Sequence, residues 1–124
     1  MAATLRSKAS LGRIPRSIGA MLRERAARFS RLPVLTEKEP NGERTLRWGE
    51  LHRLVAQAGA SLLRLGVRKG EVVAIYSRNR GDMLVFELAA MSVGAIACPI
   101  FAGYPAEPLD YILRHSGARL LAVC

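Results

Sequence analysis

The chain has 124 residues, with 19 lysines and arginines against 10 aspartates and glutamates, so its formal net charge is +9. Half of the residues are hydrophobic and 23% are charged, a composition that excludes a disordered or low-complexity protein. Cys98 and Cys124 are too few for a disulfide framework and fit a reducing compartment, and His52 and His115 form no metal-ligand spacing.

The positive charge is concentrated near the N-terminus. Residues 1–31 contain eight basic residues and one acid, Glu24, whereas the other residues contain eleven basic and nine acidic ones. A nucleic-acid module is expected to spread its basic residues over the folded surface and to interleave them with aromatic ones, but this segment has a single aromatic, Phe29. We therefore expect no nucleic-acid partner, while peripheral contact with a membrane surface stays open.

The first twenty residues also allow a targeting signal. They are rich in arginine, serine and alanine and contain no acid, as in organellar transit peptides, but they lack the apolar core of a secretory signal. The other interpretation is a solvated basic extension that leads into the first helix. We expect a cytoplasmic protein, with an organellar location as the alternative.

The first elements are a helix, a hairpin and a second helix. Apolar residues recur on one stripe between arginines over residues 17–31, which predicts an amphipathic helix. Asn41-Gly42, between two short extended runs, is a strong hairpin signal. A longer apolar stripe predicts a helix over residues 48–65, with Gly66 as its left-handed C-terminal residue.

An alternation of strands and helices follows. Apolar strands are predicted at residues 72–77, 95–101 and 118–123, with helices at 82–93 and within 102–117. Continuously apolar strands separated by helices are buried on both faces and parallel. With right-handed crossovers, the expected α/β fold is an N-terminal helix and hairpin followed by a partial doubly wound parallel sheet (β-α-β-α-β), part of a larger domain.

The uncharged stretch at residues 88–106 has about the length of a membrane span. Four glycines and prolines interrupt it, and its pattern changes from helical to strand-like midway. A helix followed by a core strand therefore explains the stretch better than a membrane helix does.

A first candidate site is the loop at residues 77–81, which follows a strand and opens a helix. Helix N-termini present free N–H groups, so this loop with Arg78 and Arg80 is a possible anion contact. The commoner arrangement is a helix capped by Asn79 or Asp82 beside two solvated arginines. The loop has neither dinucleotide-binding nor P-loop spacing.

Two further loops invite a functional interpretation. Residues 101–105 offer an aromatic wall to an apolar ligand, although aromatic side chains at a strand end more often belong to the core. Residues 66–70 form a basic, glycine-flanked loop, but the loop precedes a strand, so no helix dipole points at it and a surface turn is expected. Residue-level reasoning finds no nucleophile elbow, carboxylate pair or metal-binding motif.

Seven segments in serial order nevertheless carry a resemblance. They are residues 21–29 (MLRERAARF), 45–51 (TLRWGEL), 65–76 (LGVRKGEVVAIY), 79–80 (NR), 89–99 (AAMSVGAIACP), 104–107 (YPAE) and 111–121 (YILRHSGARLL). In this order they resemble the AMP-forming adenylating enzymes: acyl-CoA synthetases, peptide-synthetase adenylation domains and luciferase-like proteins. The resemblance covers about residues 17–124. Asn79-Arg80 and residues 99–101 favour the long-chain acyl-CoA synthetases, and residues 104–107 lean toward the peptide-synthetase domains.

The resemblance implies a reaction. The family activates a carboxylic acid with ATP and Mg2+ to an acyl-adenylate and then passes the acyl group to a thiol, usually that of CoA. The family's phosphate loop, its aromatic–Gly–x–Thr–Glu motif, its ribose-binding aspartate and its catalytic lysine all follow the part represented in this sequence. No catalytic, cofactor-binding or metal-binding residue is therefore carried over, and we expect ATP, Mg2+ and CoA to serve full-length relatives and not to bind this chain alone.

One smaller departure concerns the helix that starts at Trp48. Arg47 stands where family members usually place Ser or Thr, so Glu50 lacks its capping-box partner, which is worth about 1 kcal/mol.

We expect two regions: a basic extension at residues 1–16, and an incomplete N-terminal part of an AMP-binding domain at residues 17–124. The sequence stops in an apolar strand that has no covering helix after it, so we expect a fragment that is aggregation-prone on its own. The expected function is that of the N-terminal part of an ATP-dependent acyl-CoA synthetase acting on a fatty acid, inactive alone and partnered by the remainder of its domain. The alternatives are a non-catalytic interaction piece, a peptide-synthetase-like adenylation fragment, and a small basic protein that binds membranes or nucleic acid.

Overall fold

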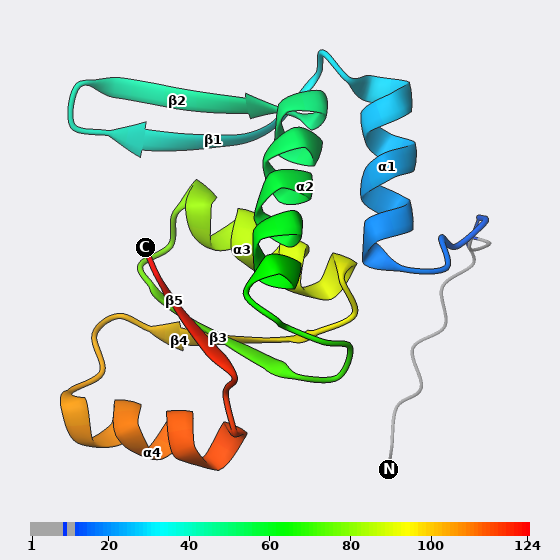
Figure 1. The fold of residues 1–124 in the computed structure, drawn as a ribbon. Coiled ribbons are helices and arrows are strands. Elements are labelled where there is room, and N and C mark those ends of the chain that lie inside the picture. The colour runs from blue at the N-terminus through cyan, green and yellow to red at the C-terminus, as the bar shows by residue number, and fades with distance from the viewer. Residues whose placement is uncertain (1–8, 10–11) are drawn as a thin grey trace, which may run out of the picture.

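The computed structural model describes residue 9 and residues 12–124, and most of the basic extension expected at residues 1–16 lies outside them. The described part is an α/β unit with a helix, a hairpin and a small parallel sheet (Figure 1). Its elements are α1 (Ile18–Phe29), β1 (Pro33–Glu39), β2 (Gly42–Arg47), α2 (Trp48–Arg64), β3 (Val72–Ser77), α3 (Gly81–Ser92), β4 (Ile96–Phe101), α4 (Ala106–Ser116) and β5 (Leu120–Val123).

Helix α1 begins after Ser17, whose hydroxyl oxygen accepts a hydrogen bond from the Ala20 N–H at 3.1 Å. It ends at Phe29, two residues before the predicted boundary, because the Leu32 N–H bonds the Phe29 carbonyl at 2.8 Å and turns the chain into β1. Leu22 and Ala26 are the buried residues of the predicted apolar stripe.

Strands β1 and β2 form the predicted antiparallel hairpin. Gly42 follows the turn with a φ of +145°, a conformation that glycine adopts at little cost. Across the hairpin, the hydroxyls of Thr36 and Thr45 are hydrogen-bonded at 2.9 Å. The Asn41-Gly42 signal is thus confirmed.

Helix α2 starts without help from Arg47, whose side chain makes no cap hydrogen bond, as the missing Ser or Thr predicts. Two backbone bonds replace the cap: the Trp48 and Gly49 N–H groups donate to the carbonyls of Leu32 and Ser30 at 3.1 and 3.0 Å. This close approach suits glycine, because a Cβ on Gly49 would lie 2.5 Å from the Ser30 hydroxyl.

The parallel sheet has the order β4-β3-β5, and all three strands run in the same direction, as predicted. The core lies between one face of this sheet and helices α2 and α3, with α1 packed on those helices, while α4 lies on the opposite face (Figure 1). Helices on both faces make the unit doubly wound.

The prediction that all three strands are buried on both faces is wrong for β4 and β5. Only the central strand β3 is enclosed, with Val73, Ala74 and Ile75 fully buried. Strands β4 and β5 are edge strands in the described part, and Ile96 and Val123 expose 53% and 70% of their surface. Pro99 is compatible with this position, since proline in sheets is confined to edges.

Candidate functional site

The carboxyl ends of the three parallel strands meet at one edge of the sheet. The loop after β3 leads into α3, the loop after β4 leads into α4, and Cys124 follows β5. In open α/β sheets this edge is where ligands bind. Both loops singled out as candidates after a strand therefore lie at the expected edge.

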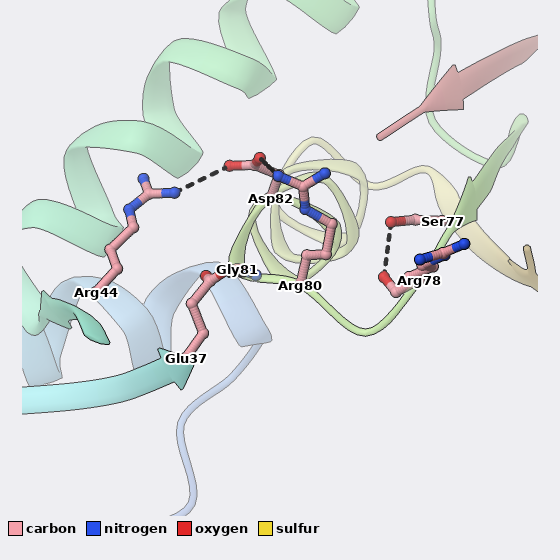
Figure 2. Close-up of polar contacts among 7 residues, drawn as sticks. All are labelled: Glu37, Arg44, Ser77, Arg78, Arg80, Gly81 and Asp82. Atoms are coloured by element: carbon pink, nitrogen blue, oxygen red, sulfur yellow. Dashed lines mark hydrogen bonds and ion pairs between the residues drawn. The ribbon is translucent and has the colours of Figure 1, made fainter. Parts of the chain in front are cut away.

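The start of α3 is closed by a carboxylate from the hairpin. The Gly81 N–H donates to Oε2 of Glu37 at 2.9 Å, and the residue that precedes the helix, Arg80, makes no cap hydrogen bond (Figure 2). The expected cap by Asn79 or Asp82 is wrong, because Asp82 lies inside the helix and pairs with arginines. Sequence reasoning missed Glu37, since it is 44 residues away and no local signal marks it.

Asp82 holds two arginines near the same helix start. Its carboxylate oxygens lie 3.7 Å from Nη1 of Arg44 on β2 and 3.8 Å from Nη2 of Arg80 (Figure 2). All three side chains are half-exposed, so these pairs orient the loop more than they stabilise the fold. Arg78 points away from this group, and Ser77 donates a hydrogen bond to the Arg78 carbonyl at 2.7 Å (Figure 2).

A groove of about 880 Å³ lies between β1 and this loop. Its charged lining is mixed and contains three basic residues, Lys38, Arg78 and Arg80, and three acidic ones, Glu37, Glu39 and Glu87. A phosphate site needs free N–H groups and unopposed positive charge. In the described part the α3 N-terminus is occupied by Glu37 and Arg80 faces Asp82, so the residues at this loop do not fit the phosphates of ATP.

The aromatic residues at the end of β4 and in the loop that follows it are exposed. Phe101 and Tyr104 expose 66% and 45% of their surface, and their rings meet edge-to-face at 6.0 Å. The expectation that they belong to the core is wrong, because β4 is an edge strand and this end of it is uncovered. Tyr76 on β3, which sequence reasoning passed over, fixes the loop by donating its hydroxyl proton toward the carbonyls of Ala102 (2.8 Å) and Tyr104 (3.3 Å).

The glycine-flanked loop at residues 66–70 is a turn at the opposite edge of the sheet, as predicted. Gly66 and Gly70 both have a φ of +84°, and the Gly70 N–H bonds the Gly94 carbonyl at 2.9 Å. The Glu71 carboxylate accepts from the Arg68 N–H at 2.7 Å. The loop is stabilised by its own residues and by the neighbouring turn.

Cys98 and Cys124 are both free thiols. Partial burial, reinforced by the negative charge of Asp82, raises the pKa of the Cys124 thiol, while Ser77 and Arg80 act in the opposite direction. Cys124 is therefore less ionised at neutral pH than an ordinary cysteine. Among the described residues, no group of three histidine, cysteine or acidic side chains is placed to hold a metal ion.

The uncharged stretch at residues 88–106 contains the end of α3 and the whole of β4, as expected. In the part of the chain that the structure describes, no helix combines the length and the apolar character that crossing a bilayer requires.

Comparison with known proteins identifies the family. Residues 22–124 match the family model of the AMP-binding enzymes. The chain belongs to this family. The match covers most of α1, the hairpin, α2 to α4 and the parallel sheet, and it includes nearly all of the segments that carried the resemblance.

Three similar proteins are informative. The mouse long-chain-fatty-acid–CoA ligase ACSBG2 is 28% identical over 88% of this chain and 16% of its own length. A Mycobacterium tuberculosis fatty acyl CoA synthetase has a TM-score of 0.79 and 29% identity over 86% of this chain and 21% of its own. NpsA-ThdA, an artificially fused adenylation–PCP di-domain of a Klebsiella oxytoca peptide synthetase, has a TM-score of 0.80 and 25% identity over 88% of this chain and 20% of its own.

The chain spans about half the length of two other curated relatives, both from Mycobacterium tuberculosis. The family match and the solved structures show that the chain corresponds to the N-terminal segment of an adenylating domain, and the solved relatives contain a large remainder that this sequence does not represent.

Proposed function

We propose that this chain forms the N-terminal part of an ATP-dependent acyl-CoA synthetase that activates a fatty acid through an acyl-adenylate. The observation that carries the proposal is the family match over residues 22–124, together with the structural similarity to the fatty acyl CoA synthetase at a TM-score of 0.79. ATP, Mg2+ and CoA would be used by the assembled enzyme. The 124 residues alone would not adenylate, because the loop that opens α3 at the carboxyl edge of the sheet does not fit a phosphate.

The second candidate is an adenylation segment of a peptide-synthetase type, which acts on amino or aryl acids. The likeness to NpsA-ThdA and the Tyr-Pro-Ala-Glu sequence at residues 104–107 favour it. The fatty-acid proposal rests on coverage and not on identity: the fatty-acid–CoA ligase ACSBG2 matches over 88% of this chain, whereas the tripeptide synthetase PhsC, at 38% identity, matches over 64% of it.

The partner in this proposal is the remainder of the adenylating domain. Edge strand β5 exposes Leu121 and Val123, at 40% and 70%, and its outer backbone groups are unpaired in the described part. A further strand beside β5 would satisfy those groups and cover the apolar side chains. The free cysteines suit assembly in a reducing cytoplasm.

A hybrid enzyme tests the proposal. Residues 17–124 replace the matching segment of the Mycobacterium fatty acyl CoA synthetase, and ATP–pyrophosphate exchange is measured with fatty, aromatic and amino acids. We expect exchange with fatty acids from the hybrid and only the blank rate from the 124-residue chain. A hybrid carrying Gly59→Leu shows how a misfolded hybrid behaves. Even a Cβ at position 59 would lie 3.2 Å from Val93, so the larger leucine side chain should not fit.

Two results would contradict the proposal. Exchange above the blank by the chain alone would show that it holds a complete nucleotide site. A well-folded hybrid that accepts amino or aryl acids and not fatty acids would favour the peptide-synthetase type.

A further inference from the structure

The N-terminal helix and its flanking residues present an arginine-rich surface. Within residues 12–32 six arginines are exposed, and the one acid, Glu24, lies 2.5 Å from Arg13 in an ion pair. The exposed arginines are Arg13, Arg16, Arg23, Arg25, Arg28 and Arg31. The segment therefore carries a strong, nearly unopposed positive charge.

Large aliphatic side chains stand exposed at both ends of this surface. Ile14 and Ile18 expose 70% and 38% of their surface before and at the start of α1, and Leu32 exposes 54% after its end. A single exposed aliphatic residue is unremarkable on a protein surface. Three of them interleaved with arginines over 21 residues resemble the composition of segments that lie in a lipid interface.

Helix α1 packs on the rest of the molecule through a side that does not include the exposed arginines. Leu22 and Ala26 pack toward α2 and α3, and α1 lies on the outer side of α2, far from α4 and the C-terminus (Figure 1). A partner that covers the β5 edge would therefore leave α1 accessible.

Phe29 shows which kind of anionic partner the surface fits. The guanidinium groups of Arg25 and Arg28 lie 5.7 and 5.0 Å from its ring centroid, so the ring is covered and half-buried. Proteins that bind single-stranded nucleic acid stack bases on accessible aromatic rings, and residues 12–32 offer none. Exposed aliphatic residues beside arginines instead match the headgroup region of an anionic bilayer.

We propose that residues 12–32 form a peripheral docking surface for anionic phospholipid membranes. The arginines face lipid phosphates, and Ile14, Ile18 and Leu32 enter the boundary between headgroups and acyl chains. This surface is separate from the carboxyl edge of the sheet and from the β5 edge, so the proposal does not depend on the acyl substrate.

Vesicle flotation with the full chain tests the proposal, because aggregated protein stays at the bottom of the gradient. Vesicles of phosphatidylcholine with about 30 mol% phosphatidylserine are compared with phosphatidylcholine alone. We expect binding to the anionic vesicles only, and loss of most binding when NaCl rises from about 0.1 M to about 0.5 M.

Two variants locate the surface. Arg16→Gln with Arg23→Gln and Arg31→Gln should weaken binding about a hundredfold, since each arginine near an anionic surface is worth about fivefold. The matched control, Arg68→Gln with Lys69→Gln and Arg119→Gln, removes the same charge elsewhere and should change binding by less than about threefold. Ile14→Ser with Leu32→Ser keeps the charge and should weaken binding about tenfold.

Three outcomes would overturn the proposal. Equal losses of vesicle binding in the two charge variants would mean that binding depends only on the net charge. Unchanged binding of the serine variant would show that Ile14 and Leu32 do not enter the lipid interface. Tighter binding to an oligonucleotide than to the anionic vesicles, with the same arginine dependence, would assign the surface to nucleic acid. Circular dichroism of every variant separates these outcomes from misfolding.

Discussion

At the scale of single residues, the contact between Glu37 and Gly81 joins two elements that no local pattern connects. A carboxylate at a helix N-terminus is favoured by the helix dipole and by the charge-assisted hydrogen bond. Glycine makes the contact possible, because a Cβ on Gly81 would clash with the Glu37 carboxylate. A carboxylate of the hairpin therefore caps α3, because the residue that precedes the helix, Arg80, makes no cap hydrogen bond.

This contact predicts a coupling between the two residues. Glu37→Ala should lower the free energy of unfolding by about 1 kcal/mol, the usual loss for a helix cap. In a Gly81→Ala background, Glu37→Ala should lower the free energy of unfolding by much less, because the added Cβ already displaces the carboxylate. Urea denaturation of dilute protein measures the free energy of unfolding in both backgrounds, with Glu39→Ala as the control for losing a carboxylate from β1. Additive losses, or equal losses for Glu37→Ala and Glu39→Ala, would contradict the assignment.

At the scale of elements, periodicity predicts each helix and strand. It does not predict how deeply a strand is buried, because burial depends on which strands are neighbours. The runs of β4 and β5 are about as apolar as that of β3, but the order β4-β3-β5 encloses β3 alone. Phe101 is exposed for the same reason. Pro99 was the one local sign that β4 is an edge strand. The Glu37 cap could not be predicted either, since it depends on the placement of the hairpin beside α3.

Helix α4 has no buried residue, although it lies within residues 102–117 and is closed by Gly117, with a φ of +61°, as predicted. Leu109, Ile112 and Leu113 are half-buried, and the side-chain pairs of the helix are local: Arg114 bonds Asp110 at 2.7 Å, and His115 stacks on Tyr111 at 5.4 Å, both pairs being four residues apart. Exposed pairs of this kind contribute about 0.2–0.5 kcal/mol each, which is little for a helix of 11 residues.

We therefore expect α4 to open locally while α2 stays folded. Amide hydrogen exchange should be much faster in α4 than in α2, whose Leu51, Val55 and Leu62 are buried. Asp110→Asn should speed exchange in α4 further and leave α2 unchanged, because the Arg114 pair supports α4 alone. Equal protection of the two helices would show that α4 is held by packing on the sheet and not by its own local pairs.

At the scale of the whole molecule, the core is one-sided. Helices α2 and α3 seal one face of the sheet, where Val73, Ile75 and Ala122 join the core. On the other face, α4 leaves Leu121 and Val123 in contact with water, and β5 presents a free edge in the described part. The positive charge that would oppose association is concentrated near α1, which lies far from this edge (Figure 1).

The last prediction is that the purified 124-residue polypeptide self-associates through β5. Each large apolar side chain left in water forgoes about 1.5–3 kcal/mol, and a free strand edge offers the hydrogen bonds that a second copy can satisfy. Size-exclusion chromatography with light scattering should show oligomers that shift toward monomer in Val123→Lys, because a charge on the edge strand blocks pairing. Leu63→Lys is the matched control, because Leu63 lies on α2 and exposes 56% of its surface. The substitution adds the same charge away from the sheet and should leave the oligomers unchanged. A sharp monomer peak of the unmodified polypeptide, with a cooperative thermal transition, would show that the one-sided core suffices.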